Sequence, residues 1–157
     1  DSDADRLRRV SDNLERLQLR ASLLCADLRG APPALQGQRF DAVLVDAPCS
    51  GTGVIRRNPD IKLLRRASDI DGFRATQSAI LDSLWPTVKP GGRLLYVTCS
   101  VLPAENQQLV EEFLSRTDGA TLQPLSLPGA IDTGTGSQLL PAEGSHDGLF
   151  YALVRRG

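Results

Sequence analysis

Two cysteines stand at the ends of two apolar segments, a position where α/β proteins place reactive side chains. Cys49 follows the segment 40–47 after a single proline, and Cys99 lies at the end of the segment 93–100. A thiolate is a strong nucleophile, but a free thiol has a pKa of about 8.5 and is little ionised at neutral pH. If the two segments are neighbouring strands, both thiols face one crevice. The pattern then favours cysteine chemistry.

Three other interpretations of these thiols stay open: buried small side chains, a disulfide between them, and metal ligands. The other soft ligands are Cys25, which has apolar neighbours and is expected in the core, and His146, which stands in a glycine-rich stretch. No spacing resembles that of a zinc site, so we expect no metal. The odd total of three cysteines favours free thiols in a reducing compartment.

Three carboxylates are candidates for ligand binding. Asp46 ends an apolar segment, where it either caps a turn or bonds to the polar edge of a ligand. Asp1 and Asp27 are expected at the ends of successive strands. In nucleotide-binding α/β folds, carboxylates at strand ends bind ribose hydroxyls or an adenine amino group.

A basic segment follows the first cysteine. Five cations lie within residues 56–66 against one acidic residue, Asp60, in a chain with 18 Lys and Arg and 19 Asp and Glu. Such a run is either a solvated face or a phosphate-binding surface, and its place after a candidate nucleophile favours phosphate contacts. The nearest flanking aromatic residue is Phe73, so the run has no stacking platform of its own. The five are Arg56, Arg57, Lys62, Arg65 and Arg66.

Apolar spacing in the first half of the chain predicts the elements that position these residues. Apolar residues three and four apart predict an amphipathic helix over about residues 3–17, with Asp3 as its N-cap. The short apolar run 21–27 predicts a strand. The nearly continuous apolar run 40–47 predicts a strand buried on both faces of a parallel sheet.

In the second half of the chain, the sequence predicts helices that alternate with strands. Helical spacing over residues 77–88 predicts a helix that residues 89–92 stop, and residues 93–100 predict another buried strand. Pro103 suits the start of a further helix. Residues 118–147 are expected to form a long loop with one short strand, and residues 148–155 a closing strand. The predicted apolar face of the helix after Pro103 consists of Leu109, Val110, Phe113 and Leu114.

This order predicts an open, mostly parallel α/β sheet in one domain, with ligands at the carboxyl ends of its strands. The 157 residues are 41% hydrophobic and 24% charged, as in ordinary soluble globular proteins. The net charge of −1 argues neither for nor against nucleic acid. No apolar run approaches the roughly 18–20 residues of a membrane span, so we expect no membrane contact.

Two segments resemble motifs of a known family. Residues 46–60 (DAPCSGTGVIRRNPD) resemble motif IV of the RNA cytosine-5 methyltransferases, and residues 96–106 (YVTCSVLPAEN) resemble their motif VI. Residues 147–152 (DGLFYA) are similar to the family's last strand, and residues 1–19 to motif II and the helix after it. The resemblance covers nearly the whole chain. The extension VIRRNPD points to the bacterial Sun/Fmu branch, which methylates small-subunit (16S) ribosomal RNA.

The resemblance implies a Rossmann-like methyltransferase sheet with S-adenosylmethionine as cofactor and a cytoplasmic location. It implies that Cys99 attacks C6 of a cytosine in RNA and that Cys49 assists product release. Asp46 would bond to the cytosine edge near N3 and lie beside the cofactor. Asp1 would hold the ribose of the cofactor and Asp27 its adenine. The base must be unstacked to be reached, so a loop or flipped-out cytosine is the expected target.

The family's glycine-rich cofactor loop and first strand, which precede motif II, are not in these 157 residues. With the absence of any methionine, this predicts a fragment: a methyltransferase domain truncated on its N-terminal side, with residues 1–157 running from motif II to the last strand. We expect such a piece alone to be inactive, to bind the methyl donor poorly and to self-associate through an unpaired strand edge.

Three alternatives remain. One is a non-catalytic RNA-binding piece that uses only the basic segment. Another is a DNA cytosine-5 methyltransferase, in which Cys49 would be the nucleophile and Cys99 would have no role. The third is a dithiol redox enzyme, although the cysteines of such enzymes usually stand two residues apart.

Overall fold

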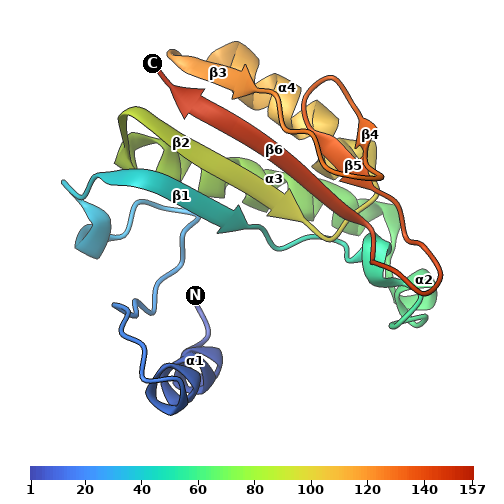
Figure 1. Cartoon of the computed structure of the whole chain (residues 1–157), viewed down its shortest axis with the longest axis horizontal. Coiled ribbons are helices and arrows are strands. Elements are labelled where there is room, and N and C mark those ends of the chain that lie inside the picture. The colour runs from blue at the N-terminus through green and yellow to red at the C-terminus, as the bar shows by residue number, and fades with distance from the viewer.

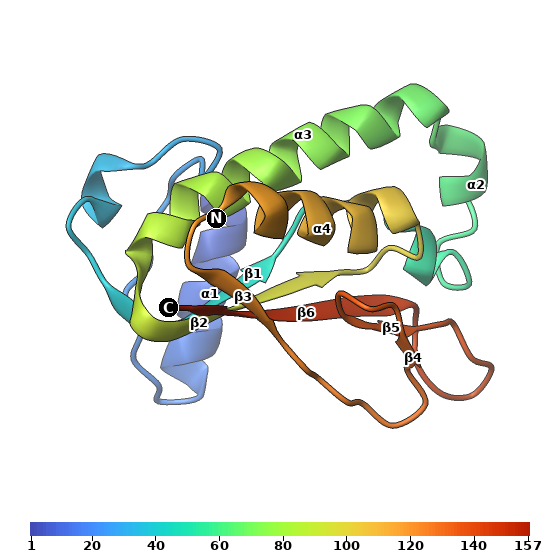
Figure 2. The same cartoon turned by 90° about the horizontal axis from the view of Figure 1, so that it is seen from above.

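A computed structural model describes all of residues 1–157, in which six strands form one sheet and two long helices cover one of its faces (Figures 1 and 2). The sheet order is β1-β2-β6-β5-β4, with β3 paired to β6. The strands are β1 (Phe40–Asp46), β2 (Val88–Thr98), β3 (Ala120–Gln123), β4 (Ile131–Asp132), β5 (Ser137–Leu139) and β6 (Leu149–Arg156). The helices are α1 (Ala4–Arg16), α2 (Ile61–Leu64), α3 (Ala67–Leu84) and α4 (Gln107–Arg116).

The α/β fold is confirmed, but the expectation of a mostly parallel sheet is wrong. Only β1 and β2 pair in parallel. Strand β6 runs antiparallel to β2, and β3 and β5 run antiparallel to β6. The reason lies in residues 118–147, where a single short strand was expected. They form three short strands, and β3 and β5 pair with the two ends of β6.

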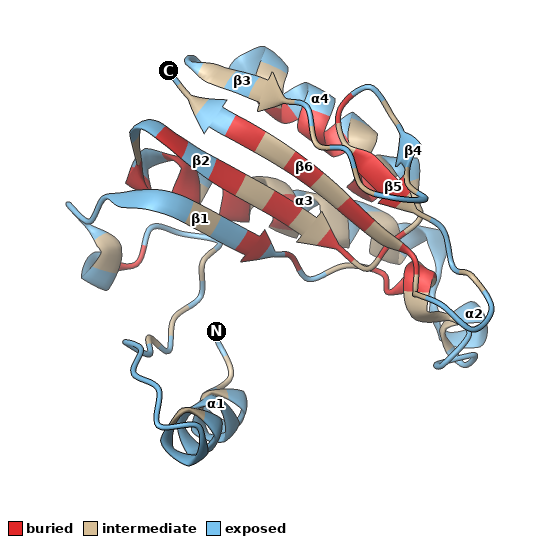
Figure 3. Cartoon of the chain, viewed as in Figure 1, coloured by how far each residue is buried: buried red, intermediate tan, exposed pale blue.

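The core lies between the sheet and helices α3 and α4. Buried residues alternate along β2 and β6 (Figure 3), as expected when one face of a sheet is covered. Leu109, Val110 and Phe113 of α4 are buried, which confirms the predicted apolar face, and Leu114 packs against the core from its margin. Phe113 meets Trp85 edge to face at 5.5 Å between ring centroids.

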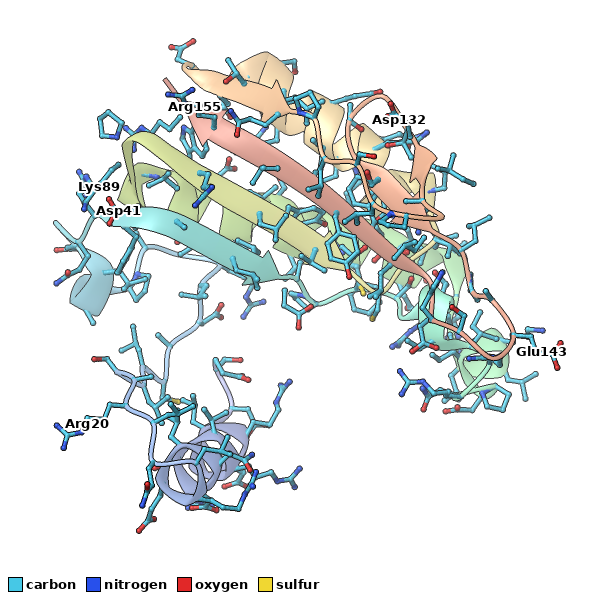
Figure 4. The ribbon with its side chains drawn as sticks, in the orientation of Figure 1. Arg20, Asp41, Lys89, Asp132, Glu143 and Arg155 are labelled. Atoms are coloured by element: carbon cyan, nitrogen blue, oxygen red, sulfur yellow. The ribbon has the colours of Figure 1, made fainter.

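Helix α3 extends the predicted helix at one end and shortens it at the other. It begins at Ala67 and ends at Leu84, followed by a 3₁₀ turn at Trp85–Thr87. Residues 89–92 therefore do not stop a helix, because they lie inside β2. Near this start of β2, the ammonium of Lys89 lies 2.8 Å from a carboxylate oxygen of Asp41 on β1 (Figure 4).

Strand β1 is not buried on both faces, contrary to what its apolar composition predicts, but its outer edge is unpaired, which confirms the expected unpaired strand edge. It pairs only with β2, and the side chain of Leu44 at its centre is 65% exposed. Apolar composition alone does not distinguish a central strand from an edge strand, because burial depends on what lies beside it.

The N-terminal arm, residues 1–27, differs most from the prediction. Helix α1 forms as expected, with the Asp3 carboxylate capping the amides of Asp5 and Arg6, but no residue of α1 is buried. Residues 21–27 are not a strand, because no neighbouring strand accepts their hydrogen bonds. The backbone bonds of this run that lie outside regular elements both involve Asp1: the Ala26 amide donates to the Asp1 carbonyl at 2.9 Å, and the N-terminal ammonium donates to the Leu24 carbonyl at 3.3 Å. Cys25 is consequently exposed rather than in the core. None of the helices combines the length and apolar character needed to cross a membrane.

Candidate active site

The parallel pairing of β1 and β2 brings the two cysteines together. Asp46 is in register with Val97, and the Ala47 amide donates to the Val97 carbonyl at 2.9 Å. The chain leaves both strands at the same end of the sheet, so that Cys49 Sγ lies 3.3 Å from Cys99 Sγ. Both thiols are free and partly buried. The predicted shared crevice is therefore confirmed, and the alternative of a disulfide is not what the structure contains.

The pKa values of the two thiols are shifted in opposite directions. The hydrogen bond with Cys49 is the main reason that the pKa of Cys99 falls to about 7, against the opposing effects of burial and of the charges on Asp46 and Glu105. The same hydrogen bond, with burial, raises the pKa of Cys49. When the pair has lost one proton, the remaining proton therefore lies on Cys49 and the negative charge on Cys99, and a Cys99 pKa of about 7 makes this state well populated at neutral pH.

A buried carboxylate, Glu105, lies behind both cysteines. Its Oε1 accepts from the Ser50 amide at 2.9 Å, and its Oε2 accepts from the hydroxyls of Ser50 at 2.5 Å and Ser100 at 2.6 Å. Glu105, Ser50 and Ser100 are each fully buried. The sequence analysis assigned no role to Glu105. The sequence feature that could have pointed to it is the Cys-Ser dipeptide at both strand ends, because two buried hydroxyls need a hydrogen-bond acceptor.

Three further contacts fix the cysteine loops: one joins the loops to each other, one joins them to the residue before β6, and one joins the Cys99 loop to the start of α4. The Gly53 amide donates to the Cys99 carbonyl at 2.9 Å, and the Gly148 amide donates to the Gly53 carbonyl at 2.8 Å. The side-chain amide of Asn106 donates to the Ser100 carbonyl at 2.9 Å. A Cβ atom at Gly53 would lie 2.0 Å from the Gly148 carbonyl oxygen, so this close approach of backbones requires glycine.

One cavity of about 670 Å³ contains every predicted catalytic and cofactor residue. Asp1, Asp27, Asp46, Cys49 and Cys99 all line it. Its apolar wall consists of Ala26, Leu28, Leu44, Val45, Ala47, Pro48, Ile80 and Leu84. The cavity lies at the carboxyl ends of β1 and β2, where α/β folds bind ligands. No group of three His, Cys, Asp or Glu side chains is arranged to hold a metal ion.

Asp1 and Asp27 line the cavity as predicted, but the elements that carry them differ from the prediction. Neither Asp1 nor Asp27 ends a strand, because the arm is irregular at both positions. Asp27 is held by Arg29, whose side-chain and backbone hydrogen bonds lower the pKa of the carboxyl to about 2. Asp1 accepts from the Asp3 amide at 3.0 Å and lies 3.6 Å from the Arg6 guanidinium.

The basic segment divides into two groups. Arg57 pairs with Asp147, and Arg65 donates through Nε to the Ser50 carbonyl at 2.8 Å while its guanidinium lies 5.0 Å from the centre of the Phe73 ring. These two arginines are therefore partly committed to the fold. Arg56, Lys62 and Arg66 are exposed.

The open sheet with its site at the strand ends defines a Rossmann-like methyltransferase domain. A methyltransferase homolog from Pyrococcus horikoshii superimposes with a TM-score of 0.82 and 29% identity, covering 100% of this chain and 52% of that one. The crystal structure of PH0851 superimposes with a TM-score of 0.90 and 35% identity, covering 99% of this chain and 36% of that one.

Sequence comparison gives the family. The model of the family described as 16S rRNA methyltransferase RsmB/F matches residues 1–155, and the chain belongs to this family. Ribosomal RNA small subunit methyltransferase B of Pseudomonas putida is 49% identical over 152 residues, which are 97% of this chain and 35% of that protein. The chain thus spans about a third of the length of the curated relatives that it matches, such as the Pseudomonas putida protein.

Proposed function

We propose that this chain supplies the catalytic residues of an enzyme that transfers a methyl group from S-adenosylmethionine to C5 of a cytosine in 16S ribosomal RNA. In this proposal residues 1–157 form part of the methyltransferase domain. The observation that carries the proposal is the Cys49–Cys99 pair, with sulfurs 3.3 Å apart at the wall of the cavity that Asp46 also lines. The family membership supplies the class of reaction.

Cys99 is the nucleophile in this mechanism. C5 of cytosine is too electron-poor to attack a methyl donor directly. Addition of the Cys99 thiolate to C6 makes C5 enamine-like and able to take the methyl group. Because the pKa of Cys99 is lowered to about 7, a large share of the thiol is ionised at neutral pH without a histidine base.

Cys49 assists the last step. After methylation, the C5 proton is lost to a base and the bond between C6 and Cys99 Sγ breaks, so that the electron pair returns to sulfur. The Cys49 thiol keeps its proton at neutral pH and donates its hydrogen bond to the departing thiolate. A hydrogen bond that strengthens as charge develops on the leaving group accelerates that step.

Asp46 positions the base. It lies at the end of β1 and lines the same cavity as both cysteines. A carboxylate there can accept a hydrogen bond from the 4-amino group beside N3, or from N3 once it is protonated, and so hold the base while the thiolate adds to C6. Its place between the cysteines and the acidic arm also brings it close to the methyl donor.

The cavity fits a nucleoside-containing methyl donor. Its apolar wall suits an adenine ring, Asp27 suits the adenine amino group, and Asp1 suits the ribose hydroxyls. When bound, S-adenosylmethionine supplies an electrophilic methyl group on a sulfonium. Asp27 keeps its negative charge over nearly the whole pH range because Arg29 holds it ionised.

The basic segment is the proposed RNA contact. Arg56, Lys62 and Arg66 are exposed and available for phosphates, whereas Arg65 also supports the Cys49 loop through Ser50. The two sulfurs are partly buried in the wall of the cavity, and enzymes that do chemistry on a base take that base out of its stack. The target cytosine must therefore leave its stack, which favours a loop or flipped-out nucleotide.

A DNA cytosine-5 methyltransferase is the second candidate, with Cys49 as nucleophile. The acidities of the pair weigh against it, since the pKa is raised at Cys49 and lowered at Cys99. A non-catalytic RNA-binding role leaves the paired thiols and the cavity without a purpose.

Adduct trapping in the enzyme that contains this chain tests the proposal. Cys99→Ala is expected to abolish methyl transfer and adduct formation. Cys49→Ala is expected to add to the base without releasing it, so a covalent protein–RNA species accumulates on denaturing gels with labelled RNA. Cys25→Ala is the matched control and leaves both unchanged. An adduct with Cys99→Ala but not with Cys49→Ala would reverse the roles.

A further inference from the structure

Both cysteine loops are anchored to the same side chain, Glu105, in the 3₁₀ turn Pro103–Glu105 that leads into α4. One carboxylate oxygen bonds to the Ser50 amide at 2.9 Å and to the side-chain amide of Gln77 at 3.0 Å. The other accepts from the hydroxyls of Ser50 at 2.5 Å and Ser100 at 2.6 Å. Ser50 and Ser100 are the residues that follow the two cysteines.

We infer that Glu105 is a positioning residue that holds the Cys49 and Cys99 loops together and thereby sets the distance between their sulfurs. This inference deepens the proposed function, on which its catalytic meaning rests. Glu105 does not line the cavity with the cysteines, so it acts through the two serines and not on the substrate.

The chemistry of the four bonds fits a clamp. All four partners donate into the carboxylate, which matches the acceptor-only character of an ionised glutamate. The two hydroxyl bonds have the short length of charge-assisted bonds. An apolar side chain here would leave two buried hydroxyls and the Ser50 amide without this acceptor.

The backbone of Glu105 is itself fixed. The Tyr96 hydroxyl donates to the Glu105 carbonyl at 2.8 Å, and Tyr96 is buried near the C-terminal end of β2. The Gln77 amide that contacts Glu105 also donates to the Pro48 carbonyl at 2.9 Å, directly before Cys49. The clamp thus connects α3, β2 and the start of α4 to the two reactive loops.

The distance between the two sulfurs matters because the hydrogen bond between them shifts the pKa of each thiol. The ionisable groups that affect Cys99 are Cys49, Asp46 and Glu105, and only Cys49 lowers its pKa through a side-chain hydrogen bond. Asp46 and Glu105 oppose ionisation by their negative charge. If the loops separate, the favourable bond is lost while both charges remain.

Glu105→Asp in this chain tests the clamp, because it keeps the charge but shortens the side chain by one methylene. Alkylation of Cys99 by iodoacetamide is followed by peptide mass spectrometry as a function of pH, without RNA or methyl donor. We expect the pKa of Cys99 to rise toward the free value of about 8.5, and its labelling at pH 7 to slow by roughly threefold. Glu111→Asp, at an exposed position of α4, is the matched control and leaves the profile unchanged.

A folded Glu105→Asp variant with the wild-type pH profile would overturn the inference, because a residue that acts only by its charge gives that result. If Glu105→Asp fails to fold, Ser100→Ala decides by the same profile, since it detaches only the Cys99 loop from the carboxylate. Since the measurement needs no RNA, its failure leaves the proposed methyl transfer untouched. Absence of methyl transfer from the enzyme with Glu105 unaltered, together with a Cys99 pKa near 7 that rises in Glu105→Asp, would count against the proposed function alone.

Discussion

The two sides of the cavity are built in different ways. On the cysteine side, Ser50, Ser100 and Glu105 are fully buried and bonded across two segments of the chain, with Ser50 and Glu105 55 residues apart. On the acidic side, no residue of α1 is buried, and Asp27 is held by a residue two positions away. The sulfurs are therefore placed by tertiary contacts, whereas the carboxylates of the arm are placed by local ones.

This difference matters for function because the two chemistries need different precision. Attack on C6 and release of the product require the sulfurs in a narrow geometry, which a rigid buried network provides. Hydrogen bonds to a ribose or an amino group tolerate an arm that adjusts on binding. The following predictions test this contrast, from the largest expected effect to the smallest.

Truncation of a buried side chain should distinguish the cysteine side of the cavity from the N-terminal arm most clearly. Phe113→Ala removes a fully buried ring that packs against Trp85, and should lower the free energy of unfolding by about 3–5 kcal/mol. Val10→Ala on α1, where the side chain is 42% exposed, should change it by less than about 0.5 kcal/mol. Urea unfolding followed by tryptophan fluorescence measures both. Equal losses would show that the arm is as tightly packed as the sheet.

Glycine replacement tests the close approach of the cysteine loops. Gly53→Ala places a Cβ 2.0 Å from a backbone oxygen of Gly148 and 2.9 Å from that of Cys99. We expect a loss of about 3 kcal/mol, because backbone on both sides must move. Gly30→Ala on the arm meets nothing within 4 Å and should be neutral. Thermal unfolding of both variants decides, and a neutral Gly53→Ala would contradict the described packing.

The acidity of Cys99 predicts a pH dependence that does not require substrate. Because the pKa of Cys99 is lowered to about 7, its alkylation rate should rise through pH 7 and level off about one pH unit above it. At pH 7 it should exceed that of a small free thiol of pKa about 8.5 by roughly threefold to fourfold, because the larger thiolate fraction is partly offset by the lower nucleophilicity of the more acidic thiol. Cys49→Ala removes the hydrogen bond and should shift the profile to higher pH. A shift to lower pH would mean that Cys49 opposes the ionisation of Cys99.

Substitutions in the basic segment should have the smallest effect, and they should separate RNA binding from the alkylation of Cys99. Neutralising Arg56 and Lys62 should reduce the salt dependence of RNA binding by about 0.7 per lost phosphate contact, without altering Cys99 alkylation. Arg65→Gln should alter both, because the Arg65 side chain supports the Ser50 carbonyl. Binding is measured by filter retention across a salt series. An unchanged slope for the first pair would indicate a solvated face.

The sequence by itself determined the α/β class, the N-cap of α1 and the residue types of the site. Asp3 caps α1 because capping is local, and the apolar face of α4 was readable because helical spacing is periodic. The likeness of both Cys-Ser motifs to a known family identified the two thiols. Their sharing of one crevice followed from two apolar strands in sequence order, since neighbouring parallel strands end at the same edge.

Only the tertiary structure decided which strands have partners and which residues hold the thiols. Residues 21–27 have strand-like composition but form none, and β1 is apolar but exposed, because both outcomes depend on what lies beside the segment. The antiparallel course of β6 depends on its pairing with β2. Glu105 stands 55 residues from Ser50, and no spacing rule links them. Their contact exists because three elements fold onto one another and leave buried hydroxyls that need an acceptor.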